Sequence, residues 1–255
     1  MTEDKGTFKK KPILMFLRNN IGHNGTIIMI NRQVSESMLI EPDKFRKVLI
    51  LIFSGLFLIL AIQVRFNLLF MHVLDDGAEL AVRHLLPQTV QSWVSLAGIC
   101  NHYWLAALFT VGLACLLYWV NYKIAMGWLL VTQLLALFVA AVVTVLLQLQ
   151  WHNGVHLGPM VPDLLSSWWL QILAVLFVIF LPRLMTQLKW RLVVQGCIIL
   201  FWCLLALARM QQNHLSLSSE LGALLFGYFW WQLSEQQYRK HAKHWREVLK
   251  IDTSI

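Results

Sequence analysis

The chain has 255 residues, of which 58% are hydrophobic and only 13% are charged. Ordinary soluble domains carry about 25% charged residues, so this composition excludes a water-soluble globular protein and favours one domain in a lipid bilayer. The net charge of +8 comes from basic residues in short flanks between apolar runs. That distribution indicates contact with a membrane surface and disfavours a nucleic-acid-binding face.

The first 47 residues are polar and basic, and we expect a cytoplasmic tail. The first apolar run, 48–64, carries no charge and lies between Lys47 and Arg65, whose side chains can reach the two membrane interfaces. It begins too far along the chain for a cleavable signal peptide. We therefore expect it to remain as the first membrane-spanning helix.

The segment 65–91 mixes charged and apolar residues at helical spacing. This pattern predicts an amphipathic helix on the membrane surface. Its polar residues are Asp75, Asp76, Glu79, Arg83 and His84, and its apolar residues are Leu69, Phe70, Leu74, Leu80, Val82 and Leu85.

Five further apolar runs predict five more spans, within 93–120, 125–148, 168–181, 192–208 and 221–233. Lys and Arg concentrate in both tails and in the turns near Lys123 and 183–191, whereas the alternate loops nearly lack them. The positive-inside rule therefore places both termini in the cytoplasm. The predicted fold is an all-α polytopic bundle of about six transmembrane helices.

Three parts of the chain are predicted: a basic tail (1–47), the transmembrane domain (48–233) and a basic carboxy-terminal tail (234–255). Residues 238–250 combine several Lys, Arg and His residues with a possible apolar face. We expect a helix there that lies against anionic lipid head groups.

Ionisable residues gather in the loops that this topology places on the outer face. A metal site is one hypothesis, because His152 and His156 are four residues apart and His214 could join them with Asp163 or Glu220. Gly154 and the pair Gly158–Pro159 argue against a helix that presents both imidazoles on one face. We therefore predict no metal site and no cofactor.

The stretch from Ala208 to Gly222, with Arg209, His214 and a nearby acid, resembles the third motif (SRxxxxxHxxxD) of the type 2 phosphatidic acid phosphatase superfamily. The resemblance covers roughly 48–233 and implies that family's six-helix membrane fold. It also implies that His214 attacks phosphorus, Arg209 holds phosphate oxygens and Glu220 orients the imidazole. Ungapped alignment puts Ser218 at the position of the family's Asp, which makes Ser218 a candidate substrate-binding residue.

The other two motifs of that family are missing. The loop 151–159 has no Lys or Arg where KxxxxxxRP should follow the third span, and Leu165-Ser166-Ser167-Trp168 stands where PSGH should open the fourth. His152 or His156 could replace the lost second-motif histidine and are the remaining candidate substrate-binding residues. Without the motif cations little remains to stabilise a phosphoryl transition state. The resemblance therefore implies a diverged member.

Two functions follow from this pattern. One is a lipid phosphatase or phosphotransferase acting on phosphatidic acid or a polyprenyl pyrophosphate at the outer face of a bacterial inner membrane. The other is a catalytically inactive protein of the same fold that binds a lipid phosphate or serves as an assembly subunit of an envelope complex, with a membrane-protein partner. A transporter is less favoured because no predicted span carries a buried charge and no repeat is found.

Overall fold

The computed structural model describes residues 45–66, 68–119, 122–150, 156–157, 159–181 and 187–248. Residues 1–44, His152 and residues 249–255 lie outside this part of the chain, and only the backbone of His156 is described. The predicted amino-terminal tail thus falls almost wholly outside it.

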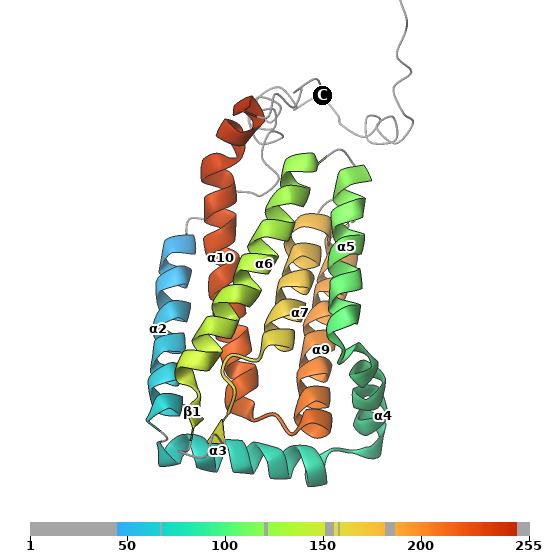
Figure 1. Cartoon of the computed structure of the whole chain (residues 1–255). Coiled ribbons are helices and arrows are strands. Elements are labelled where there is room, and N and C mark those ends of the chain that lie inside the picture. Colours follow the sequence, from blue (N-terminus) through green and yellow to red (C-terminus); the bar gives the residue numbers. More distant parts are fainter. Residues whose placement is uncertain are drawn as a thin grey trace, which may run out of the picture. The chain divides into compact units, whose positions relative to one another are not determined.

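Apolar helices run along the bundle, and the β-structure among the described residues is one short strand pair (Figure 1). The long elements are α2 (Arg46–Arg65), α5 (Tyr103–Trp119), α6 (Lys123–Leu147), α7 (Leu164–Val175) with its continuation η4 (Leu176–Phe180), α9 (Leu188–Asn213) and α10 (Leu217–Val248). The short elements are α3 (Leu69–Leu80), η2 (Ala81–Leu85), α4 (Gln88–Ala97), η3 (Gly98–Cys100) and the antiparallel strands β1 (Leu149–Gln150) and β2 (His156–Leu157). The predicted all-helical class is confirmed.

Three helices of the described chain, α2, α6 and α9, are long and apolar enough to cross a membrane. The helices on either side of residues 101–102 pass the same test only together, and a bend of 71° separates them. The prediction of a multi-pass membrane protein is thereby confirmed, with three or four candidate spans among the described residues. The predicted span 168–181 falls on α7–η4, a shorter apolar helix, and 221–233 falls on α10, which is not among the candidate spans, so these two spans stay predictions.

Close helix contacts hold α10 in the bundle, where it packs against α2 and α7. Two glycines permit this approach: a Cβ on Gly222 would lie 2.4 Å from Cγ1 of Val161, and one on Gly227 would lie 2.6 Å from Cδ2 of Leu170. Because Val161 is fully buried and the Pro162 backbone lies just behind it, a larger residue at 222 would strain the packing of α10, whereas at 227 the end of the Leu170 side chain could move aside. The register of α10 against the segment before α7 is therefore tightly set.

The helix α10 has 32 residues, which corresponds to about 48 Å at 1.5 Å per residue. A hydrocarbon core is about 30 Å thick, so α10 is longer than one span requires. The predicted boundary at residue 234 lies inside this continuous helix. At the end of the bundle where α2 begins, Arg46 forms a buried ion pair with Glu235 of α10 at 2.9 Å.

The helix α3 lies across the opposite end of the bundle (Figure 1). Met71, Leu74 and Val82 of the predicted amphipathic segment are buried or half-buried, whereas Phe70 and Leu80 are exposed. The apolar side of α3 is therefore only partly covered: one part packs against the bundle and the other is exposed. The helix itself was predicted correctly, and its position on the membrane surface stays a prediction.

Candidate functional site

A buried arginine joins four elements at the end of the bundle that α3 covers. Nη2 of Arg209, near the end of α9, lies 2.7 Å from Oδ1 of Asp163, the residue before α7. Nη1 donates to Oδ1 of Asn101, at the bend between η3 and α5, at 2.6 Å. Nε lies 3.7 Å from Oε1 of Glu220 in the first turn of α10. We call these four residues the Arg209 network.

Further hydrogen bonds fix the members of this network. The side chain of Asp163 caps α7 by accepting from the backbone N–H of Ser166 at 2.7 Å, and the Ser166 hydroxyl donates to Glu220 at 3.0 Å. The amide of Asn101 donates to Gln212 and Asn213 of α9 at 3.2 and 2.8 Å. The network is therefore a rigid junction between helices.

Burial determines which acidic residue of the Arg209 network carries a negative charge. Arg209, Asp163 and Glu220 are 4, 6 and 3% exposed, and Glu220 precedes the apolar part of α10, which begins at Leu221. Burial, and secondarily the charge of Asp163, raises the pKa of Glu220 to about 8, although Ser166 and Arg209 act in the opposite direction. At neutral pH Glu220 is mostly protonated and Asp163 neutralises Arg209. The guanidinium has no unbalanced positive charge for a phosphate.

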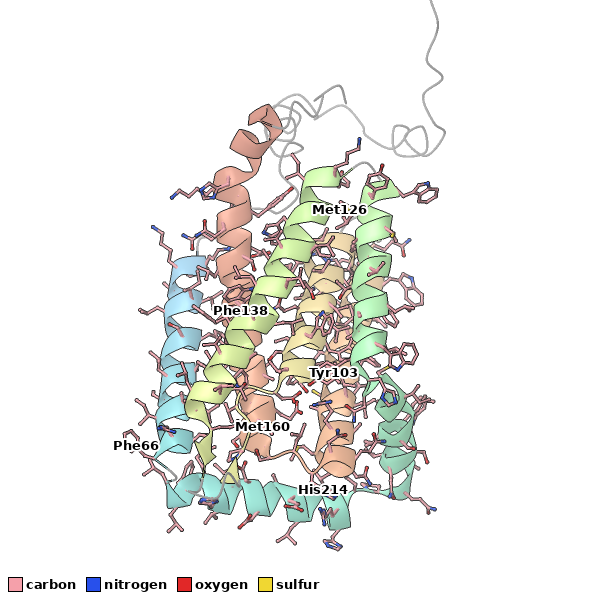
Figure 2. The ribbon with its side chains drawn as sticks, viewed as in Figure 1. Phe66, Tyr103, Met126, Phe138, Met160 and His214 are labelled. Carbon is pink, nitrogen blue, oxygen red and sulfur yellow. The ribbon has the colours of Figure 1, made fainter. Side chains whose placement is uncertain are left out.

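His214 lies at the corner between α9 and α10, next to α3 (Figure 2). Its backbone adopts the left-handed conformation (φ 52°) that reverses the chain after α9, and its residue is exposed. Nδ1 of His214 contacts Nη2 of Arg83, in η2. Arg83 also pairs with Glu79 of α3 at 2.7 Å, with both side chains about half exposed (41 and 51%).

The contact with Arg83 determines which nitrogen of His214 carries the proton. A guanidinium can only donate, so Nδ1 of the neutral imidazole accepts and the proton lies on Nε2. The exposed Nε2–H is then a hydrogen-bond donor and not a nucleophile. Together Arg83 and His214, which we call the corner pair, present donors to an anion at this surface.

Ser218 is held by an acidic residue of α3. Its backbone N–H and its hydroxyl donate to the two carboxylate oxygens of Asp75, at 2.8 and 2.7 Å. Because Ser218 lies in the first turn of α10, Asp75 satisfies a free backbone donor of that helix and adds a favourable charge at its amino terminus. This places Ser218 in the attachment of α3 to α10.

The structure brings together only some of the predicted site residues. Arg209 and Glu220 are neighbours, but His214 pairs with Arg83. The roles taken from the family resemblance therefore stay predictions. His152 lies outside the described residues, as does the side chain of His156, and within the described part of the chain no group of three His, Cys, Asp or Glu side chains is placed to hold a metal ion.

One expectation requires correction. The predicted fifth span ended at 208, so no span seemed to carry a buried charge, but α9 continues to Asn213 and includes the buried Arg209. The helix is longer because Gln212 and Asn213 are bonded to Asn101. Arg209 nevertheless lies in the last two turns of α9, at the end of the bundle, where Asp163 compensates its charge.

The sequence did not identify Arg83 or Asn101 as site residues, and it did not reveal that Asp163 caps α7 and pairs with Arg209. The spacing Asp163-x-x-Ser166 before an apolar run is a helix-start signal that could have identified the cap. No local signal links Arg83 to His214, because 131 residues separate them.

No protein-family model, no curated protein and no solved structure matches this chain. The resemblance to the type 2 phosphatidic acid phosphatases thus rests on the third-motif residues alone.

Proposed function

We propose that this chain is a multi-pass membrane protein of about six spans that binds the phosphate of a lipid head group at the end of the bundle covered by α3, without hydrolysing it. The observation that carries the proposal is the corner pair. An exposed guanidinium and an exposed imidazole N–H on adjoining elements provide charge-assisted donors of the type that phosphate oxygens accept.

The distribution of charge supports an orientation with α3 outside. Lys47, Lys123 and Lys189 lie in the first turns of α2, α6 and α9, at the end of the bundle opposite α3. Basic residues flank spans on the cytoplasmic side. On this basis both termini are cytoplasmic, and α3 and the corner pair face outward. A bacterial inner membrane is part of the proposal and does not follow from this charge distribution.

The positions of the third-motif residues support the part of the proposal that excludes turnover. A phosphatase of the family that the motif resembles needs an attacking histidine with a carboxylate partner and cations around phosphorus. Here His214 has Arg83 beside Nδ1, and Asp163 neutralises Arg209 inside the bundle. Binding without chemistry fits these contacts better than catalysis, and a membrane-protein partner remains compatible with it.

The first test is binding of dihexanoyl phosphatidic acid, a soluble probe, to the purified full-length protein in detergent. Arg83→Gln and His214→Gln should each weaken binding roughly tenfold or more, because each removes a hydrogen bond to a charged group. The matched control is His84→Gln, since His84 is an exposed histidine adjacent to Arg83. Equal affinity of all four proteins, or equal affinity for dihexanoyl phosphatidylcholine, would refute a site at the corner pair.

The second test asks whether the phosphate is released. Purified protein in nanodiscs is given phosphatidic acid, undecaprenyl pyrophosphate or phosphatidylglycerol phosphate, and inorganic phosphate is measured with and without His214→Ala. We expect no release from any substrate. Release that disappears in the variant would make the protein a diverged lipid phosphatase, with Arg83 in place of the missing motif cations.

A further inference from the structure

The helix α3 and its continuation η2 have three distinct faces. One face packs on the bundle through Met71, Leu74 and Val82, and Met71 belongs to the core cluster of Leu60, Val64 and Val161. A second face is polar, and a third is apolar and exposed. The polar face consists of His72, Asp76, Glu79 and Arg83, and the exposed apolar face consists of Leu69, Phe70, Val73 and Leu80.

The exposed apolar face is too large to be incidental. Phe70 is 63% exposed, Val73 66% and Leu80 61%, and they recur at the three- and seven-residue spacing that aligns side chains on one side of a helix. Soluble surfaces rarely expose such a contiguous stripe, and when they do it marks an interaction site. An amphipathic helix with this division of faces is typical of one that lies in a membrane interface.

Neighbouring elements place α3 at the edge of the hydrocarbon layer. The charge-free run of α2 ends at Arg65, four residues before α3, and Nη1 of Arg65 donates to the carbonyl of Gln148 just beyond the end of α6. Two candidate spans therefore end at the level of α3. Exposed apolar side chains also continue before and after it in the chain, at Phe66 (Figure 2) and at Trp93 of α4.

We propose that the exposed apolar face of α3 is an interaction surface for lipid and is immersed in the interfacial layer of the leaflet at this end of the bundle. Because α2 and α6 end at the level of α3, lipid that surrounds these spans also reaches the exposed apolar face of α3. This lipid is sufficient to cover that face. The polar face of α3 then borders the head-group region.

The immersion of α3 extends the proposed function. It rests on that function for one point, which is that the corner pair binds a lipid. Arg83 lies on the polar face of the same helical segment whose apolar face enters the leaflet. The corner pair is thereby held at the depth of lipid phosphates, so a bilayer lipid can reach it without leaving its leaflet. The recognised class is an anionic phospholipid of that leaflet.

The test measures the depth of two adjacent positions in the full-length protein. Cys100, Cys115, Cys197 and Cys203 are replaced by Ala, and one new cysteine is placed by Val73→Cys or by the matched control His72→Cys. These neighbours are about 100° apart around the helix and occupy the apolar and the polar face. Each is labelled with an environment-sensitive fluorophore and reconstituted in phosphatidylcholine–phosphatidylglycerol vesicles that contain lipid with a spin label on carbon 5.

We expect lipid-borne spin label to quench the fluorophore at position 73 severalfold more than at 72, and aqueous iodide to show the reverse order. Leu80→Cys, two turns further along the same face, should behave like Val73→Cys. Iodide quenching at 73 equal to that at 72 would overturn the inference, because the stripe would face water. Quenching by neither agent would overturn it too, because protein would then cover the face.

Arg83→Gln in the Val73→Cys background separates this inference from the proposed function. We expect this variant to keep the lipid quenching at position 73 while losing binding of dihexanoyl phosphatidic acid. Unchanged phosphatidic acid binding with normal lipid quenching would refute the phosphate site alone. Binding that is lost in Arg83→Gln, together with no lipid quenching at position 73 in either protein, would refute the immersion of α3 alone.

Discussion

Two arginines at the same end of the bundle have opposite environments. Arg209 is almost fully buried and is held by Asp163, Asn101 and Glu220, whereas Arg83 is 41% exposed and pairs with Glu79 and His214. A buried guanidinium with compensating carboxylates is part of the scaffold, because its charge cannot be left alone in a low-dielectric interior. An exposed one can exchange its partner for an anion at little cost. We therefore expect the motif residue Arg209 to support the scaffold and Arg83, which belongs to no motif, to be available to a ligand.

The largest expected effect on stability comes from replacing Arg209, the buried arginine. Arg209→Met leaves Asp163 and Glu220 facing an apolar side chain, and it should destabilise the protein by about 3–5 kcal/mol. Arg83→Met removes only an exposed ion pair and should cost at most about 1 kcal/mol. Unfolding by SDS in mixed micelles measures both. Similar losses for the two variants would contradict the assignment of Arg209 to the scaffold.

The pH dependence of stability tests the charge balance of the Arg209 network. Since the folded-state pKa of Glu220 is about 8 and its ordinary value is about 4.5, the folded protein binds a proton that the unfolded chain releases. Glu220 therefore lowers the free energy of unfolding as pH rises from 4.5 through 8, by on the order of a few kcal/mol.

Glu220→Gln mimics the protonated acid and should flatten this pH dependence. Thermal unfolding midpoints in detergent, measured from pH 5.5 to 8.5, compare the two proteins. At pH 8.5 the variant should be at least as stable as the wild type. If Glu220→Gln loses as much stability with rising pH as the wild type does, groups other than Glu220 cause the loss.

A third prediction tests how the packing of α10 positions Glu220. Gly222→Ala puts a methyl group 2.4 Å from Val161, next to the turn that carries Asp163, and overpacking of this kind costs typically about 1–3 kcal/mol. Gly55→Ala in α2 meets nothing within 4 Å and should be neutral or stabilising by up to about 1 kcal/mol. Equal stability of the two variants in the SDS titration would show that the α10 contact is not tight.

The smallest effect concerns the attachment of α3, which carries Asp75 and Asp76 side by side. Asp75→Ala removes both hydrogen bonds to Ser218 at the start of α10 and should cost about 1 kcal/mol, as the loss of a helix cap does. Asp76→Ala is a surface change and should stay within about 0.5 kcal/mol. Proteolysis of α3 should accelerate only in the first variant.

The apolar runs of this sequence predicted the main helices well. The runs 48–64, 125–148 and 192–208 correspond to α2 (Arg46–Arg65), α6 (Lys123–Leu147) and α9 (Leu188–Asn213). The reason is that a lipid bilayer requires a long apolar helix with all its backbone groups paired internally, whatever its neighbours are. The bend at residues 101–102 escaped prediction because the side chain of Asn101 is bonded to α9, more than a hundred residues away.

The amino-acid sequence by itself determined the membrane class, the all-helical fold, the positions of the longest helices and the presence of a surface helix after Arg65, because composition and periodicity act locally. Only the tertiary structure decided that Arg209 is enclosed by Asp163 and Glu220, that Arg83 meets His214 and that part of the apolar side of α3 stays exposed. Those outcomes depend on which distant segments pack together and on how much water each charge retains. For that physical reason the buried Arg209 belongs with the scaffold, whereas the exposed Arg83 is a candidate ligand-binding residue.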